Sequence, residues 1–270
     1  MAPSVMSTLS ATYRSRHKVL GYPVDVVSEE GALDVVKAAW QNEKGIHIVT
    51  LNAEMVVQAQ ENQELDRIIR HAHLIIPDGA GVVWALKLAG QQANRLPGVE
   101  LAEKTLQLAS DEGRRVVLIG GKPEVLTHLE TLIPDRYPGI KLVGSQNGYF
   151  SKDEEDEIVD ALSNSEPELI LIALGVPKQE FFIDRWQHAF PKAVMVGVGG
   201  SFDVWTGSVK RAPKFFRQCN LEWFYRLMAE PWRAKRMMSS LPKFGFQVLG
   251  ASLKGSGRKS TDSDSGEDKG

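Results

Sequence analysis

Six short apolar runs rich in β-branched residues recur along the chain, separated by helix-like stretches of about 10–15 residues. The runs cover residues 46–50, 74–77, 116–120, 141–143, 169–174 and 193–198. Such alternation is typical of βα units, whose strands form a parallel sheet covered by helices. The sequence therefore predicts an α/β fold with a Rossmann-like parallel sheet flanked by helices. After residue 206 the apolar runs cease, and a helical pattern with interleaved Trp and Arg predicts a C-terminal helical appendage.

Composition divides the chain into four parts. At 270 residues, 43% of them hydrophobic, the chain is long enough to bury a full core. The expected parts are a flexible N-terminus (1–16), a main α/β domain (17–206), an appendage (207–250) and a disordered, low-complexity tail (251–270).

The charge is unevenly distributed. Residues 209–243 contain nine Lys and Arg against two Glu, a net charge of +7. Because the whole chain carries −2 and residues 244–270 are neutral, residues 1–208 carry −9. A basic segment with interleaved aromatics is typical of helices that dock on anionic membranes. Two other readings stay open: a helical cap whose aromatics complete the core, and a nucleic-acid-binding surface, although no nucleic-acid-binding motif accompanies it and no such partner is expected.

Targeting and redox signals favour a cytoplasmic location. The single cysteine, Cys219, cannot form an internal disulfide or a zinc knuckle, as expected for a reducing compartment. The first twenty residues lack the apolar core of a signal peptide, and no run of 18 apolar residues occurs. The sequence therefore predicts a protein that neither spans a membrane nor is exported by the usual route.

Two short polar segments, called polar islands below, each follow an apolar strand and predict a ligand-binding site. Thr50 and Asn52 come at the end of the first run, and Asp78 follows the second. In open α/β sheets, ligands bind at the carboxyl ends of the strands. Asp78 is a candidate general base that would take a proton from an acceptor hydroxyl, or it caps the following helix. Asn52 would hold a ligand hydroxyl, cap the helix near Ala53, or both.

Two glycine-rich turns are candidate substrate contacts. Gly120, Gly121 and Lys122 follow a strand and open a helix, where backbone N–H groups and the helix dipole favour an anion. The spacing of a Walker loop is missing, so ATP hydrolysis is not predicted. Gly199 and Gly200 lie in a turn that resembles a dinucleotide loop only superficially, because Phe202 occupies the third glycine position; an NAD site is not expected.

Metal chemistry is poorly supported. The six histidines show no paired ligand spacing, and His71 and His73 more simply end a helix. An acidic D-x-D pattern occurs only at 262–264 in the tail. We therefore expect no metal and no other cofactor, with backbone amides and cations stabilising any departing diphosphate.

The strings around these residues resemble the WecG/TagA/CpsF family of glycosyltransferases, also called glycosyltransferase family 26. The resemblance runs from about residue 18 to residue 244, and nine strings occur in the same order. They are TLNAEMV (50–56), IPDGAGVVW (76–84), RLPGVEL (95–101), LIGGKP (118–123), NGYF (147–150), LGVPKQE (174–180), GVGGSFD (197–203), G-x-VKRAP (207–213) and LEWFYRL…EPWR (221–233).

The resemblance implies an inverting, metal-independent transferase in cell-envelope polysaccharide synthesis. It would move N-acetylmannosamine or a related hexose from a UDP-sugar to a polyprenyl-diphosphate-linked sugar. The family's base matches Asp78, its active-site Thr and Asn match Thr50 and Asn52, and its pocket Gln matches Gln179. Arg95 falls where a family arginine is thought to meet acceptor phosphate.

The resemblance also assigns the appendage to the membrane and the lipid acceptor, which implies a peripheral location on the inner face of the cytoplasmic membrane. The candidate arginines for that role are Arg211, Arg217, Arg226 and Arg233. One departure is Glu100, where many relatives have Asp, so no role is carried over to that carboxylate. The alternative function is a non-catalytic, membrane-recruited nucleotide-sugar-binding scaffold, which would not need to retain a base such as Asp78. A homo-oligomer is compatible with either function.

Overall fold

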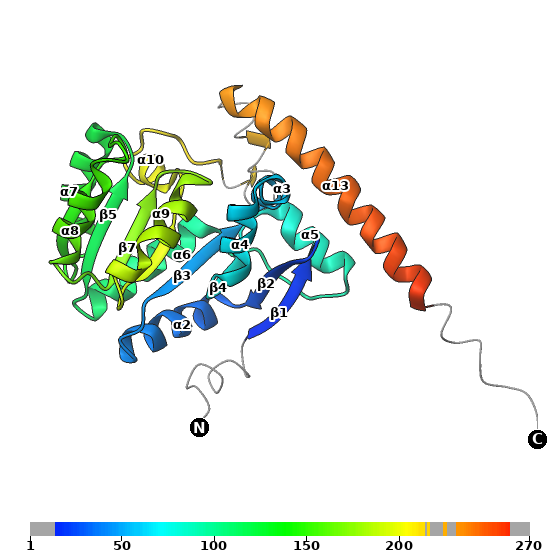
Figure 1. Cartoon of the computed structure of the whole chain (residues 1–270), viewed down its shortest axis with the longest axis horizontal. Helices are drawn as coiled ribbons and strands as arrows, with labels where there is room; N and C mark the ends of the chain where they lie inside the picture. Colours follow the sequence, from blue (N-terminus) through cyan, green and yellow to red (C-terminus); the bar gives the residue numbers. More distant parts are fainter. Residues whose placement is uncertain (1–13, 214, 217–223, 226–230, 260–270) are drawn as a thin grey trace, which may run out of the picture.

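A six-stranded sheet forms the centre of the protein (Figure 1), which is described by a computed structural model for residues 14–213, 215–216, 224–225 and 231–259. Its order is β4-β3-β8-β7-β5-β6, and every neighbouring pair is parallel. Each of the six apolar runs forms one strand, so the predicted fold class is confirmed. The strands are β3 (Ile46–Leu51), β4 (Leu74–Pro77), β5 (Arg115–Gly120), β6 (Lys141–Gln146), β7 (Leu169–Ala173) and β8 (Val194–Gly197).

Helices cover both faces of the sheet because successive strand residues point to opposite sides. On β3, Ile48 packs with α2 (Glu29–Gln41), α6 (Gly98–Asp111) and α7 (Pro123–Arg136), whereas its neighbour Val49 packs on the opposite face. The helices on that opposite face are α3 (Ala53–Glu61), α4 (Gln63–His71), α5 (Ala80–Leu88), α8 (Glu155–Ser163) and α9 (Lys178–Trp186), with the short turn η1 (Gln187–Ala189). The short helix α10 (Ser201–Trp205) follows β8.

A β-hairpin that the sequence analysis did not identify precedes the sheet: β1 (Arg14–Val19) pairs antiparallel with β2 (Tyr22–Val27). Residues 14–16 were expected to belong to the flexible N-terminus, and this is wrong. Arg14 and Arg16 each donate two hydrogen bonds to the fully buried Asp25, which also accepts from Ile75 N on β4. Burial would raise the pKa of Asp25, but these bonds lower it overall. The ion pairs hold the first strand in place.

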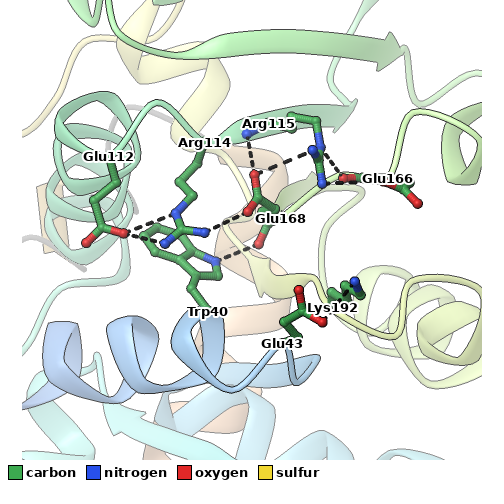
Figure 2. Close-up of polar contacts among 8 residues, drawn as sticks. All are labelled: Trp40, Glu43, Glu112, Arg114, Arg115, Glu166, Glu168 and Lys192. Atoms are coloured by element: carbon green, nitrogen blue, oxygen red, sulfur yellow. Dashed lines mark hydrogen bonds and ion pairs between the residues drawn. The ribbon is translucent and has the colours of Figure 1, made fainter.

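A polar network joins the amino ends of β5 and β7 (Figure 2). It lies at the opposite end of the strands from the predicted site. Glu168, just before β7, accepts from Arg114 Nη1 at 2.7 Å and from Arg115 N at 3.1 Å. Its backbone carbonyl accepts from Trp40 Nε1 of α2 at 2.7 Å, and the Arg114 guanidinium stacks over the Trp40 ring. Burial opposes the ionised form of Glu168, but these donors lower its pKa overall. The network fixes α2 and β5 against β7.

The long C-terminal helix α13 (Pro231–Lys259) runs along the edge of the domain and projects beyond it (Figure 1). Phe244 and Val248 are buried among side chains of α3 and α5, and Gln247 exchanges hydrogen bonds with Gln60 of α3. The helix continues to residue 259, so the disordered tail does not begin at residue 251 as expected. Once a helix is anchored, each added residue gains a hydrogen bond without a new nucleation cost. No helix within the described ranges is long and apolar enough to cross a membrane.

Candidate functional site

The two polar islands meet at the carboxyl ends of β3 and β4. In the parallel register, Thr50 pairs with Ile76 and Leu51 with Pro77, so Asn52 and Asp78 follow side by side. Asp78 N donates to Leu51 O at 3.0 Å. A Cβ atom built on Gly79 would lie only 3.1 Å from Asn52 Cβ, so this glycine lets the two loops approach closely. The sheet register therefore brings Thr50 and Asn52 together with Asp78 from a distant part of the sequence. This group of residues at the carboxyl ends of β3 and β4 is called the corner below.

Asp78 does not cap the helix that follows it. The N-cap of α5 is Gly79, which makes no side-chain cap bond. Asp78 Oδ1 instead accepts from Gly98 N at 3.0 Å, at the start of α6. Arg95 lies against the same residue: its Nε donates to Asp78 O at 2.5 Å, and its Nη2 is 3.7 Å from Oδ1. The carboxylate is 26% exposed. A partly exposed carboxylate next to a guanidinium is thus available to a substrate.

Asn52 caps α3, as one of its two predicted roles required. Its Oδ1 accepts from Met55 N at 2.9 Å, and its backbone is extended as at most N-caps. An Asn side chain also carries an NH₂ group that this bond does not use. Capping therefore orients the side chain and is compatible with donation to a ligand oxygen.

Thr50 is packed between two glycines at this corner. It is 9% exposed, and its Oγ1 lies 3.5 Å from Gly197 O of β8. A Cβ atom built on Gly98 would lie 2.8 Å from Thr50 Cγ2, closer than real Cβ atoms come to other atoms. Sequence analysis did not single out Gly98 or Gly197, because glycine is common at helix starts and strand ends and does not by itself indicate a functional site.

Gln179, in the first turn of α9, joins the corner to the second glycine turn. Its side chain is nearly inaccessible, and its Oε1 accepts from Gly199 N at 3.1 Å. Gly199 has φ +52°, in the left-handed region, and Gly200 forms the N-cap of α10. Gln179 Nε2 donates to Glu180 Oε1 at 2.9 Å. Burial raises the pKa of Glu180 to about 7, and the bond from Gln179 opposes that rise.

Glu180 was missed by sequence analysis. An acidic residue in the first turn of a helix is normally read as an exposed partner of the helix dipole. Its burial depends on the packing of α9 against the sheet, and nothing in the local sequence signals that packing.

The first glycine turn departs from its expected role. Gly121 N donates to Ala173 O at 3.1 Å, so this amide is used within the protein and not kept for an anion. Gly120, at φ +112°, is required for packing, because a Cβ there would lie 2.4 Å from Ala173 O. Lys122 is the exposed N-cap of α7. The amides of the first turn of α7 have no acceptor within the helix, so an anion contact there would use them and Lys122.

Comparison with known proteins identifies the family of this chain. The family described as "Glycosyl transferase WecG/TagA/CpsF family" matches residues 17–258. The chain belongs to this family. It is 42% identical over 207 residues, 76% of the chain and 79% of the relative, to the N-acetylglucosaminyldiphosphoundecaprenol N-acetyl-beta-D-mannosaminyltransferase of Bacillus spizizenii. The enzyme of the same name from Bacillus subtilis is 38% identical over 206 residues, 76% of the chain and 79% of the relative. The protein is a glycosyltransferase, as the resemblance implied.

The appendage arginines of this glycosyltransferase are only partly described. Arg211 forms an ion pair with Glu100, in the first turn of α6, and its buried Nε has no hydrogen-bond partner among the described residues. This pair ties the start of the appendage to the helix whose first amide holds Asp78. Arg217 and Arg226 lie outside the described residues, and of Arg233 only the backbone, in α13, is described.

The described part of the glycosyltransferase contains no group of three or more His, Cys, Asp or Glu residues arranged to hold a metal ion. The reaction without a metal remains a prediction.

Proposed function

We propose that the protein transfers N-acetylmannosamine, or a related hexose, from a UDP-sugar to a polyprenyl-diphosphate-linked N-acetylglucosamine. The proposal rests mainly on the sequence identity of this chain, 42% and 38%, to two transferases whose names specify that sugar and an undecaprenol-linked acceptor. The residues of the corner at Asp78 supply the chemistry that such a transfer needs. The product would enter cell-envelope polysaccharide synthesis.

The proposed reaction is a single displacement with inversion. Asp78 takes the proton of the acceptor hydroxyl, whose oxygen forms a bond to the anomeric carbon of the donor sugar. The bond from that carbon to the UDP oxygen breaks, and the electron pair leaves with UDP. Thr50 and Asn52 are proposed to contact the donor sugar, and the buried Gln179 side chain is proposed to hold the turn at Gly199 against which the donor binds. The proton acceptor is one residue from β4, whereas the glycine turn at 120–122 lies four strand spacings away, about 19 Å at 4.8 Å per spacing.

The charge that develops on the leaving diphosphate needs nearby positive groups. Arg95, which lies against Asp78, is the proposed cation beside the reacting centre, whereas Lys122 and the first-turn amides of α7, four strand spacings away, are proposed to contact a more distant part of the UDP. Preorganised amides and cations stabilise such charge without reorganising during the reaction. We therefore expect transfer to need no divalent metal and no other cofactor.

We also propose that α13 and the basic segment dock on the anionic inner face of the cytoplasmic membrane, where a polyprenyl acceptor lies. Phe246, Leu249 and Leu253 form an exposed stripe at helical spacing on α13, with Phe246 and Leu253 each 76% exposed. Phe215 and Phe224 are exposed in the basic segment. Burying three such side chains contributes several kcal/mol, and each cation near an anionic leaflet adds about 1 kcal/mol.

The substrate assignment is tested by UDP release from a panel of UDP-sugars, with and without a polyprenyl-diphosphate-GlcNAc analogue, in the presence and absence of EDTA. We expect release that requires the acceptor, is highest with UDP-N-acetylmannosamine and persists in EDTA. Loss of activity in EDTA that Mg²⁺ or Mn²⁺ restores would refute metal independence. UDP binding without release from any donor would favour the non-catalytic scaffold.

Membrane docking is tested by sedimentation with vesicles of anionic phosphatidylglycerol, with phosphatidylcholine vesicles as the control. The variant F246S/L249S/L253S changes only exposed side chains, so it should fold normally but bind anionic vesicles at least tenfold more weakly. Unchanged binding by this variant would contradict a membrane role for the exposed face of α13.

A further inference from the structure

Glu180 is a buried carboxyl group that the proposed reaction does not use directly. It is 1% exposed, and its Oε2 has no hydrogen-bond partner among the described residues. Burying a carboxyl group with an unsatisfied oxygen costs free energy that an apolar residue would avoid. Within the described part of the chain its side-chain partner is Gln179, whose Nε2 donates to Glu180 Oε1 at 2.9 Å.

Gln179 connects this carboxyl group to the corner that contains Thr50. Its Oε1 holds Gly199 N, and a Cβ built on Gly197 would lie 2.3 Å from its Nε2, so its amide lies directly against the end of β8. Gly197 O faces Thr50 Oγ1 at 3.5 Å. Contacts therefore run without a gap from Glu180 through Gln179 and the glycine turn to Thr50.

The two ends of the Gln179 side chain are not interchangeable in these surroundings. An amide carries an acceptor oxygen at one end and two N–H donors at the other. Gly199 offers a donor and Glu180 offers an acceptor, so only one orientation satisfies both. If the amide turned by half a rotation, two donors would face each other at Gly199, and the left-handed turn would lose its anchor.

We propose that Glu180 is a positioning residue for the glycosyl transfer, fixing the Gln179 amide so that the turn at 197–200 and Thr50 are held where the donor sugar-nucleotide binds. This proposal rests on the proposed function, because it assigns that donor to this corner. Glu180 touches no substrate and acts through Gln179. Supporting groups of this kind preserve the sub-ångström placement on which transfer depends.

The test compares E180L with E180Q in the full-length protein. E180Q keeps an oxygen that accepts from Gln179 Nε2, whereas E180L fills similar space without an acceptor. We expect E180L to raise KM for the UDP-sugar, and Kd for UDP by calorimetry, about tenfold, with a smaller change in kcat. E180Q should stay within about threefold of the wild type. Asp184, on the same helix and paired with Arg67 at the surface, provides the matched control D184N.

A double-mutant cycle separates positioning from general destabilisation. If Glu180 acts through Gln179, E180L should have no further effect on the donor KM in a Q179A background. Full additivity of the two substitutions, or equal losses in E180L and E180Q, would overturn the proposal. An inactive wild-type enzyme would refute the proposed function instead, and the UDP affinities of the same variants would still decide the role of Glu180.

Discussion

Replacing Gly98 by Ala adds one methyl group that presses against the side chain of Thr50. The added methyl would lie 2.8 Å from Thr50 Cγ2, 3.1 Å from Thr50 Cβ and 3.2 Å from Thr50 Oγ1. Ordinary contact begins near 3.4 Å, so Thr50 or the start of α6 must move by about 0.6 Å. The amide of Gly98 is also the donor to Asp78 Oδ1, so the same shift disturbs both proposed catalytic residues.

Two effects on stability oppose each other. Ala is favoured over Gly in helices by up to about 1 kcal/mol, but overpacking costs about 1–3 kcal/mol. We expect G98A to lose about 1 kcal/mol of unfolding free energy. Activity should fall further, because a displacement near 1 Å at a reacting centre costs about a hundredfold. For a shift of about 0.6 Å, we expect kcat/KM to fall about tenfold or more.

The assay is acceptor-dependent UDP release, combined with urea unfolding. G245A is the matched control, since a Cβ on Gly245 of α13 would meet nothing within 4 Å, and it should be active and no less stable than the wild type. T50S removes the atom in closest contact, so G98A/T50S should be more active than G98A. Wild-type kcat/KM in G98A, or no recovery in the double variant, would refute the steric reasoning.

Two further predictions concern the amino-terminal side of the sheet. Burial, with a smaller contribution from His73, lowers the pKa of His47 to about 3, so the unfolded chain binds a proton between pH 6.5 and pH 3 that the folded protein does not. The contribution of neutral His47 to the unfolding free energy is complete above pH 6.5 and decreases as the pH is lowered. Between pH 7 and pH 5, urea unfolding should show that the wild type loses about 2 kcal/mol more unfolding free energy than H47L. Equal losses in the two proteins would contradict the burial argument. E168A removes the acceptor shared by Arg114 and Arg115 and should lower the unfolding free energy by about 2 kcal/mol in the same assay. UDP affinity should stay unchanged, because the network lies at the opposite end of the strands from the proposed site. Weakened UDP binding in a folded E168A protein would contradict that separation.

The sequence predicts the sheet well because its strands are buried on both faces. Short, mainly apolar runs rich in β-branched residues, such as residues 46–49 and 169–172, are typical of strands buried on both faces of a parallel sheet, and each forms a strand. The convergence of Asn52 and Asp78 was predictable for the same reason, since both follow parallel strands. Their chemical roles remain predictions.

The remaining features depend on contacts between distant residues. The strand Arg14–Val19 is largely polar and basic, and its place depends on Asp25 and on the edge of the sheet near Ile75. The burial of Glu180 depends on how α9 packs. The helical character of residues 251–259 follows from anchoring of α13 at Phe244 and Val248, which local composition rich in Gly and Ser does not indicate.

The most direct test of the central claim is the rate of acceptor-dependent transfer by D78N. The amide oxygen of that variant can still accept from Gly98 N, so the corner should keep its shape while losing the base. We expect kcat to fall about a hundredfold or more, with UDP affinity and unfolding free energy close to the wild type. The matched control is D160N, at an exposed position of α8, which should transfer normally. Turnover by D78N within a few-fold of the wild type would contradict the assignment of Asp78 as the catalytic base.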